Sequence, residues 1–406
     1  MRKFCLLLLL MIAPLICQAS GYTLSDISAA AAGMADAYIC RVDDPSAVWY
    51  NPAALTRLDG NQVTIDASIS NTSSDFHSQI TDAIVHSGTI HSVPSNFFYS
   101  HQLSEDTHFG FGVYRPFGVH TQWPLDSGAA FVSSDFNLRV FYVTPSFGFK
   151  LTPNVSIGAG LDFVFSDFEW DKNQSLQPAS QTIIAQQVSV RGSDFGFNIG
   201  TLVQTDDFQL AITYKTRVDT NYDGSVVFLN VPPAFRPTYP DGGANITLTL
   251  PSQISFGAAT HFQNLSFEGD MIYTRWRDFE ALRLNFDRNT PPDINLRRGF
   301  LSTWTLRFGA DYTWRKNYIF RAGAFHDPTP VPEKALDPIL PDSSRNGFSA
   351  GLGYQQGNWS LNVAYTAEFF SDRVSPLNNF ASPLAAGTYS NHAHLLSFGF
   401  GYKFTK

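Results

Sequence analysis

Apolar and polar residues alternate strictly along several stretches of this chain. In residues 304–314 the even positions are apolar, whereas the odd positions are Thr, Arg, Gly and Asp. The same division recurs in residues 210–218, 361–369 and 396–404. Because successive side chains of a β-strand point to opposite faces, each stretch predicts a strand with one apolar and one polar face.

Short and long connections alternate between the predicted strands. The tight turns lie at residues 103–106, 151–154, 205–207, 263–264, 315–317 and 356–358. The long, Pro-rich connections lie near residues 76–92, 121–135, 171–187, 229–247, 288–301, 327–346 and 371–391. A soluble antiparallel sandwich also has alternating strands, but a transmembrane barrel places all its short turns on one side of the membrane and its loops on the other. The pattern predicts an all-β, antiparallel transmembrane barrel of about 14 strands over residues 61–406.

The N-terminus has the pattern of a secretory signal peptide. Arg2 and Lys3 precede the apolar run 4–13, and small residues follow at positions 19–21. This run is shorter than the roughly 20 residues that a membrane-spanning helix needs. We therefore expect residues 1–19 to be removed, and the barrel to reside in the outer membrane of a Gram-negative bacterium.

Composition agrees with a lipid-facing wall and excludes several functions. Aromatic residues make up 15% of the chain, including 36 Phe, and only 15% of residues are charged. Two of the three cysteines lie in the signal peptide, so the mature chain keeps Cys40 alone and has no internal disulfide and no thiolate metal cage. The formal charge of -8 becomes -10 without Arg2 and Lys3, which argues against nucleic acid as a partner. We expect neither a metal nor a cofactor.

The segment before the first predicted strand has a different pattern. Residues 28–37 are small and predict a helix, and residues 43–53 carry Trp49 and Tyr50. This segment is too apolar for a solvated tail. We interpret residues 20–60 as a partly helical hatch that plugs the barrel.

The third predicted strand, residues 108–119, is interrupted by Pro116. Proline has no N–H to donate to the strand ladder, and Gly118 tolerates a bend. The sequence predicts a kink or bulge there, although a proline at a strand end is the alternative.

Several motifs resemble the FadL/TodX family of outer-membrane transporters of hydrophobic compounds. They are residues 43–55, which contain Asn51, Pro52 and Ala53, and residues 251–257, 273–276, 321–332 and 341–345. Their order and spacing span nearly the whole mature chain. The resemblance implies a plugged barrel in which Asn51-Pro52-Ala53 is the hatch signature and Tyr22 reaches into the ligand pocket. It also implies a lateral opening in the third strand, at Arg115, Pro116, Phe117 and Gly118.

The function that the resemblance implies is uptake of hydrophobic compounds, long-chain fatty acids first among them, by diffusion through the plugged barrel and lateral release. Alternatives are transport of aromatic or alkane hydrocarbons, a general porin, or an outer-membrane lipase. No zinc-binding H-E-x-x-H motif occurs, and we expect no enzyme. The expected partners are a hydrophobic ligand and lipopolysaccharide or other outer-membrane lipid, and the barrel needs no second copy.

Two sets of residues are candidates for contacts with the ligand. A carboxylate in an apolar pocket needs a cation, and the cations that face the lumen by alternation are Lys215, Arg217, Arg307 and Arg321. Salt bridges inside the wall with Asp162, Asp311 and Glu368 are the alternative role for these cations. The outer loops offer apolar contacts at Ile183, Ile184, Phe228 and Phe235.

Overall fold

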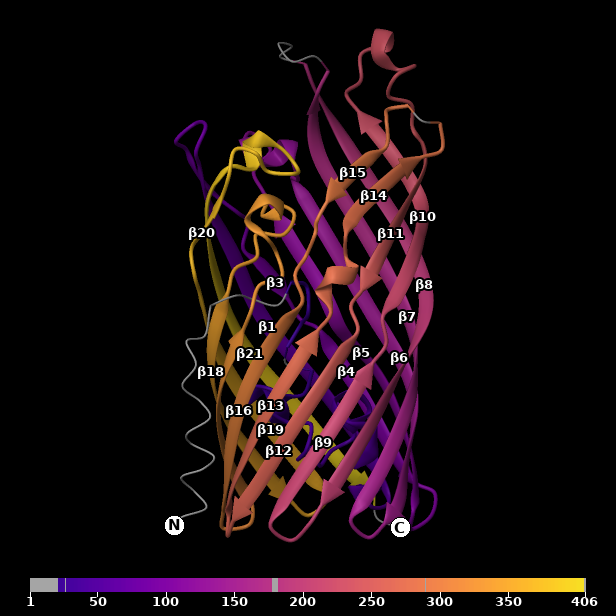
Figure 1. Ribbon diagram of the computed structural model, residues 1–406, viewed down its shortest axis with the longest axis vertical. Helices are drawn as coiled ribbons and strands as arrows, with labels where there is room; N and C mark the ends of the chain where they lie inside the picture. Colours follow the sequence, from indigo (N-terminus) through magenta and orange to yellow (C-terminus); the bar gives the residue numbers. More distant parts are fainter. Residues whose placement is uncertain (1–20, 26, 177–181, 289, 405–406) are drawn as a thin grey trace.

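The computed structural model describes residues 21–25, 27–176, 182–288 and 290–404. Within them, twenty-one strand segments form one closed antiparallel barrel (Figure 1). Eight wall strands are continuous, five are split into two segments and one into three, so the described wall has fourteen strands. The predicted barrel is confirmed, whereas the expected signal peptide lies outside the described residues.

The eight continuous wall strands are β1 (Asn61–Ser78), β5 (Thr107–Gln122), β6 (Asp135–Thr152), β7 (Val155–Ser175), β8 (Ile183–Gln204), β17 (Tyr318–Asp327), β18 (Arg345–Gln356) and β21 (Gly387–Phe404). The five strands split in two are β9–β10 (Phe208–Lys215, Val218–Leu229), β11–β12 (Gly242–Leu250, Gln253–Phe262), β13–β14 (Leu265–Thr274, Ala281–Phe286), β15–β16 (Ile294–Arg297, Thr303–Trp314) and β19–β20 (Trp359–Phe370, Arg373–Ser375). The second wall strand consists of three segments that all pair with β1, namely β2 (Ile84–His86), β3 (Ile90–Ser92) and β4 (Ser95–Gln102). The wall closes where β1 pairs with β21, from Asn61↔Phe404 to Ser78↔Gly387.

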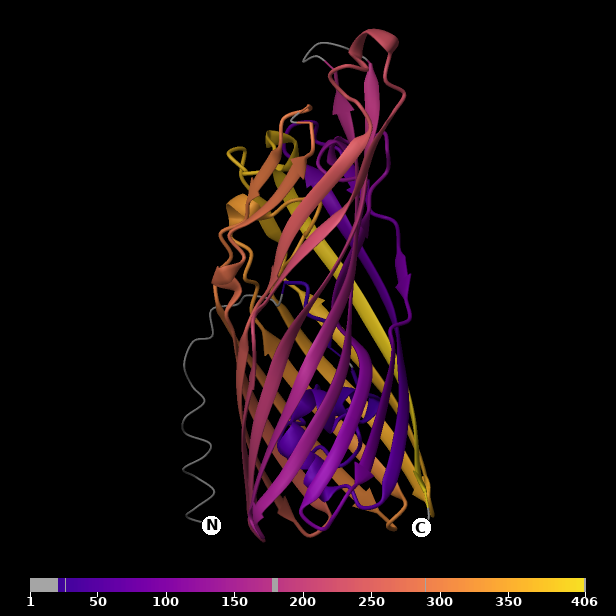
Figure 2. The same ribbon diagram turned by 90° about the vertical axis from the view of Figure 1, so that its right-hand side faces the viewer.

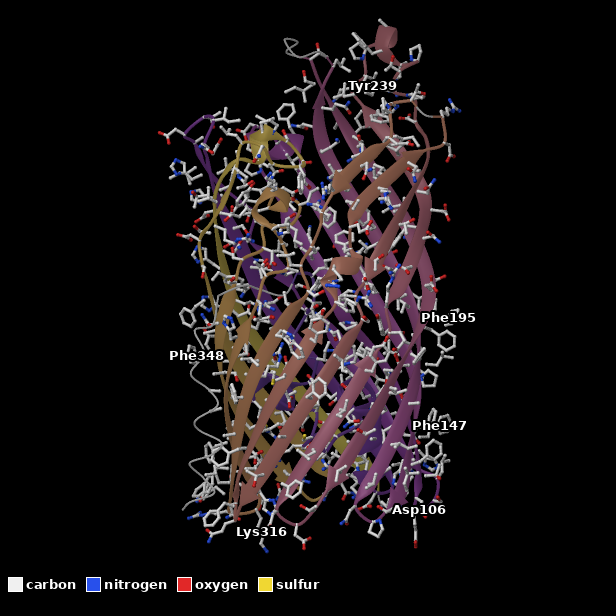
Figure 3. All side chains as sticks on the ribbon, in the orientation of Figure 1. Asp106, Phe147, Phe195, Tyr239, Lys316 and Phe348 are labelled. Carbon is white, nitrogen blue, oxygen red and sulfur yellow. The ribbon has the colours of Figure 1, made fainter. Side chains whose placement is uncertain are left out.

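The two ends of the barrel differ, as the connection lengths predict. The lower end carries tight turns, where Figure 3 shows Asp106 and Lys316. At the upper end β7, β8 and β10 rise above the rest of the wall (Figure 1). β7 continues to Ser175 inside the connection predicted at 171–187. The sequence underestimates this strand because above the lipid both faces can be polar, and the alternation that marks a strand disappears.

The outer face carries an apolar belt. On β7 the exposed side chains include Ile157, Leu161 and Phe165, and above them the outward positions turn acidic at Asp167 and Glu169. Figure 3 shows Phe147, Phe195 and Phe348 projecting away from the wall. Such a belt of apolar side chains bounded by polar ones is the surface that a membrane barrel presents to lipid.

Residues 27–58, which we call the hatch segment, lie inside the lower half of the barrel (Figure 2). The segment contains α2 (Ala29–Ala32), α3 (Ala47–Tyr50) and the 3-10 helix η1 (Pro52–Arg57). No helix in the described residues is long and apolar enough to cross a membrane. Acidic side chains of the wall hold the segment: Glu268 accepts the Cys40 N–H at 2.6 Å, and Asp270 accepts the Tyr38 N–H at 2.9 Å.

Asn51, Pro52 and Ala53 join the hatch segment to the wall. The Asn51 amide donates to the carbonyl of Thr201 at 3.1 Å, and its Oδ1 accepts the Ala53 N–H at 3.1 Å. The backbone of Pro52 approaches β7 so closely that a Cβ added to Gly158 would lie 2.2 Å from the Pro52 carbonyl carbon. Position 158 therefore has to be glycine for this contact to form.

The replacement Gly158→Ala is expected to loosen the hatch segment. The added methyl group overlaps the Pro52 backbone, and such overpacking costs about 1–3 kcal/mol. We expect the single-channel conductance in planar bilayers to rise above that of the parent protein. Gly242→Ala is the matched control, because a Cβ at Gly242 meets nothing within 4 Å. Equal conductance of the two variants would contradict the role given to this contact.

Candidate functional site

The wall is interrupted beside β5. β4 pairs with β5 only up to Phe97↔Val113, and no strand in the described part of the chain pairs with this side of β5 above that point. On the other side, the register between β5 and β6 shifts between Tyr114 and Phe117, which leaves Arg115 and Pro116 out of the ladder. The Arg115 N–H instead donates to the side chain of Asn96 at 3.0 Å. The kink predicted at Pro116 is therefore present as a bulge, and it borders a gap in the wall.

Residues 21–25, which we call the N-terminal strap, fill this gap. The Leu24 N–H donates to the Pro116 carbonyl at 2.9 Å, and the Gly118 N–H donates to the Tyr22 carbonyl at 2.9 Å. Thr23 and Phe117 form the antiparallel bridge between these two hydrogen bonds. The strap thus satisfies backbone groups that the bulge would otherwise leave without partners.

Tyr22 places a buried aromatic side chain inside the barrel. Its ring packs edge-on against Trp276, with 4.7 Å between centroids, and also contacts Phe117 and Phe279. Its hydroxyl donates to the carbonyl of Thr249 at 2.6 Å. A single residue of the strap therefore contacts both the kinked strand and the opposite wall.

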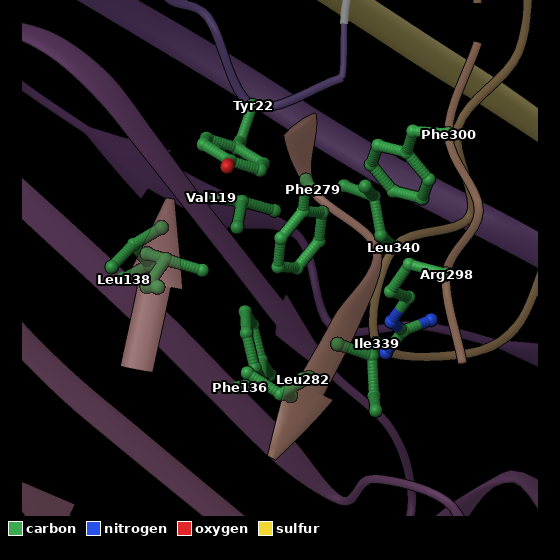
Figure 4. A pocket seen from close by; sticks show the side chains of 11 residues that line it. Tyr22, Val119, Phe136, Leu138, Phe279, Leu282, Arg298, Phe300, Ile339 and Leu340 are labelled. Atoms are coloured by element: carbon green, nitrogen blue, oxygen red, sulfur yellow. The ribbon is translucent and has the colours of Figure 1, made fainter. Parts of the chain in front are cut away.

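Tyr22 also lines a closed apolar pocket (Figure 4). Ten of its eleven lining side chains are apolar or aromatic, and the eleventh is Arg298. The free cavity volume is about 20 Å³, which is room for about one water molecule. Pockets that hold drug-sized ligands measure about 300–1,000 Å³, so a long-chain ligand has to displace lining groups.

Arg298 is the one charged group of this pocket. Its side chain is 2% exposed, and its Nη1 donates to Asp337 at 2.6 Å and to the carbonyl of Ala335 at 3.3 Å. Its Nη2 is buried without a hydrogen-bond partner. Figure 4 shows the guanidinium turned toward Ile339 at the pocket wall. The ion pair with Asp337 neutralises the charge of Arg298, and the Nη2 group is a donor without a partner that is buried beside the pocket.

The chain matches the family described as outer membrane protein transport protein (OMPP1/FadL/TodX) over residues 10–404. It belongs to this family. The long-chain fatty acid transport protein of Escherichia coli O6:H1 is 24% identical over 376 residues, which cover 82% of this chain and 83% of that protein.

Two solved structures share the fold of this family member. A FadL homologue from Pseudomonas aeruginosa superposes with a TM-score of 0.86 at 20% identity, covering 95% of this chain and 100% of that one. The toluene transporter TodX of Pseudomonas putida superposes with a TM-score of 0.73 at 16% identity, covering 96% and 100%. The protein is therefore an outer-membrane transporter of hydrophobic compounds and not an enzyme, and the family indicated by the sequence motifs is confirmed.

One serine motif of this transporter resembles an enzyme signature, and its position in the fold decides what it is. Residues 347–351 read Gly-Phe-Ser-Ala-Gly, the G-x-S-x-G pattern of a nucleophile elbow. An elbow requires a sharp turn between a strand and a helix, whereas these residues lie within the continuous strand β18. The motif is therefore part of the barrel wall.

Three of the four predicted cations contact the hatch segment and do not line the pocket. Lys215 Nζ lies 3.6 Å from the centroid of the Trp49 ring. Arg307 donates to the carbonyl of Ala35 at 2.8 Å. Arg321 donates to Asn362 at 2.8 Å, and its side chain packs beside Gly33. These cations stabilise the plugged state.

The acidic residues expected to pair with these cations have other partners. Asp162 accepts hydrogen bonds from Thr144 at 2.7 Å and Asn198 at 2.8 Å. Asp311 pairs with Arg41 of the hatch segment, and Glu368 pairs with Arg345 at 2.9 Å.

The prediction that Arg217 faces the lumen is wrong. The wall strand is split between Lys215 and Val218, so the alternation changes phase there, and Val218 is buried whereas Arg217 is exposed. Arg217 pairs with the exposed Asp219 at 2.6 Å on the outer face. It is therefore not a candidate for binding a ligand inside the barrel.

Two of the predicted outer contacts are also corrected. Ile184 and Phe228 are fully buried, because β8 and β10 extend further upward than expected and turn these side chains inward. Ile183 is exposed and Phe235 is partly buried at the 3-10 helix η3 (Pro233–Phe235), so these two remain available on the outer surface.

The strap has a titratable contact at Asp342, in the loop between β17 and β18. The Asp342 carboxylate accepts the Gly21 N–H at 3.2 Å and the hydroxyl of Thr329. Burial raises the pKa of this carboxyl from 3.8 to about 6. The Gly21 N–H stabilises the ionised carboxylate, and this hydrogen bond lowers the pKa relative to burial alone. The strap therefore binds the carboxylate more tightly than the neutral acid, so its seating is favoured as the pH rises through about 6 and weakened as the pH falls below it.

We expect the labelling of a Thr23→Cys variant by an impermeant maleimide to speed up, relative to the intrinsic rate of the thiol, as the pH falls from 7 to 5. The comparison is with the same variant carrying Asp342→Asn, which keeps an oxygen acceptor for the Gly21 N–H but does not titrate. The ratio of the two rates removes the intrinsic pH dependence of the thiol. A ratio that stays constant across this range would refute the role of Asp342.

Proposed function

We propose that this transporter takes up long-chain fatty acids and releases them sideways through the gap beside β5. The observation that carries the proposal is the unsatisfied Nη2 of Arg298, buried beside an otherwise apolar pocket, where a ligand that displaces lining groups would reach it. A buried donor left without a partner costs about 1–3 kcal/mol. A carboxylate would satisfy this donor with a charge-assisted hydrogen bond, whereas an alkane or an aromatic hydrocarbon would leave it unpaired.

The closed pocket links binding to release. A chain of many methylenes does not fit into about 20 Å³, and Tyr22 is the lining residue that belongs to a terminal segment rather than to the wall. When the ligand displaces Tyr22, the two hydrogen bonds between the strap and β5 break as well. The gap that the strap had filled is then free for lateral passage into the membrane.

Within the predicted hatch, residues 20–60, the strap moves in this proposal, whereas the hatch segment, residues 27–58, is a permanent plug. Its contacts with the wall run from Asp66, which accepts the Ala29 N–H at 2.8 Å, to the close approach of Pro52 and Gly158. A ligand that leaves sideways does not need the hatch to move. The barrel closes on itself, so the transporter acts as a monomer surrounded by lipopolysaccharide and other outer-membrane lipid.

The second candidate substrate is a monoaromatic hydrocarbon, because the related structure TodX is a toluene transporter. Competition uptake separates the two. Radiolabelled palmitate is given to cells that lack their own fatty-acid transporter and express this protein, with excess unlabelled oleate or toluene. We expect oleate to suppress uptake and toluene to leave it unchanged; suppression by toluene alone would overturn the assignment.

A further inference from the structure

A second cavity opens on the outer surface, above the closed pocket. It is a groove of about 410 Å³ between the end of β15, the loop that joins β17 to β18, and the loop that joins β19 to β21. Its lining residues are Arg297, Gly299, Pro332, Glu333, Lys334 and Phe380. None of them belongs to the loops that the sequence suggested as the outer contact surface.

The groove combines positive charge with an aromatic side chain. Arg297 and Lys334 are exposed, and neither forms an ion pair with a carboxylate in the described part of the chain. Glu333 is the single carboxylate of the lining, so the groove carries an excess of one positive charge. The Arg297 guanidinium lies 5.3 Å from the centre of the Phe380 ring. An anionic head group and an apolar tail are complementary to this arrangement.

Phe380 is fixed in the groove by its backbone. Its N–H donates to the carbonyl of Lys334 at 2.7 Å, which ties the β19–β21 loop to the 3-10 helix η5 (Glu333–Ala335). This hydrogen bond holds the backbone of Phe380 beside that of Lys334.

The groove and the closed pocket are lined by neighbouring residues of the chain. Arg297 and Arg298 are consecutive residues at the end of β15; the first is exposed in the groove and the second is buried in the pocket. The β17–β18 loop likewise lines the groove with Pro332 and the pocket with Leu340. An anion held by Arg297 thus lies one residue along the chain from the unsatisfied donor of Arg298.

We propose that this groove is the outer capture site, which holds a long-chain carboxylate by Arg297 and Lys334 with its tail on Phe380 and passes the carboxylate to Arg298. The inference rests on the proposed function. It places capture beside β15 and η5, away from the β10–β11 loop that carries η3 (Figures 1 and 2). The alternative occupant with the same anionic chemistry is a lipopolysaccharide phosphate.

The test is the double variant Arg297→Gln/Lys334→Gln, with uptake of radiolabelled palmitate as the readout. We expect the KM for palmitate to rise about tenfold and the maximal rate to stay unchanged, because capture is weakened and the inner site is intact. The dependence of KM on ionic strength should become weaker at the same time. Arg236→Gln/Arg288→Gln is the matched control, since it removes two exposed cations from the outer loops without touching the groove. Heat-modifiable migration in gels checks that each barrel is folded.

The possible outcomes distinguish failure of the capture site from failure of the proposed function. No palmitate uptake by the parent protein would overturn the proposed function itself. Normal KM in the double variant, or an equal rise in the control, would overturn the capture site and leave the proposed function standing. A double variant that copurifies with less lipopolysaccharide but keeps its KM would identify the groove as a site for lipid phosphate and overturn the inference.

Discussion

Uptake is expected to stop when the N-terminal strap is tied to β5 by a disulfide. Thr23 and Phe117 are bridge partners, so their Cα atoms have the separation found across an antiparallel pair, which suits a disulfide. The variant carries Thr23→Cys and Phe117→Cys in a Cys40→Ala background, because Cys40 is the one other cysteine after the predicted signal peptide. Palmitate uptake should fall to the level of cells without the protein, and reduction with dithiothreitol should restore it.

The disulfide between positions 23 and 117 requires its own control, since any disulfide could rigidify the barrel. Phe147→Cys and Ala159→Cys join β6 and β7, which already pair at these positions. This second disulfide should leave uptake unchanged under oxidation. If the strap remains locked and transport continues at the normal rate, release through the gap is ruled out.

The second large effect is expected at the Arg298–Asp337 pair. Removing Arg298 alone would leave Asp337 as an unpaired buried charge, which costs about 3–5 kcal/mol and would disturb the fold. The informative variant is therefore Arg298→Met/Asp337→Asn. The amide oxygen introduced by Asp337→Asn would still accept the N–H groups of Ile339 and Leu340, which Asp337 Oδ1 now accepts at 3.0 and 3.3 Å.

In this variant the affinity for palmitate should fall at least about tenfold, because the ligand loses one charge-assisted hydrogen bond. The affinity for hexadecanal or another ligand without a charge should change much less, because the apolar lining is intact. Equilibrium binding of the two ligands to the purified protein measures both effects. An equal loss for both ligands would mean that Arg298 supports the fold of the pocket rather than the head group.

The barrel was predictable from the sequence because lipid imposes a simple rule on it. Every wall strand must present apolar side chains outward, so the pattern of residues 304–314 survives as β16 with Trp304 and Phe308 exposed. The kink was predictable from Pro116 for an equally local reason, the missing N–H. Both features depend on residues that are neighbours in the chain.

The site was less predictable because its residues meet from distant parts of the chain. Arg298 lies in a stretch that the sequence assigns to a polar outer connection, and only the fold brings it into contact with Asp337 and near Tyr22. Arg217 was misplaced for the opposite reason, since a split in the strand shifts the alternation by one residue. The sequence does show two consecutive arginines, Arg297 and Arg298, in this connection. Only the fold shows that Arg298 is the buried one.

Hydrogen exchange at the amides of Leu24 and Gly118 tests most directly whether ligand binding opens the wall. Both amides are bonded across the contact between the strap and β5 at 2.9 Å. Saturating palmitate should speed exchange at both, while Val164, which pairs with Tyr142 of β6 and Asp194 of β8 in the wall, keeps its protection. Unchanged or slower exchange at Leu24 and Gly118 in the palmitate-bound protein would contradict the coupling of the pocket to the lateral gap.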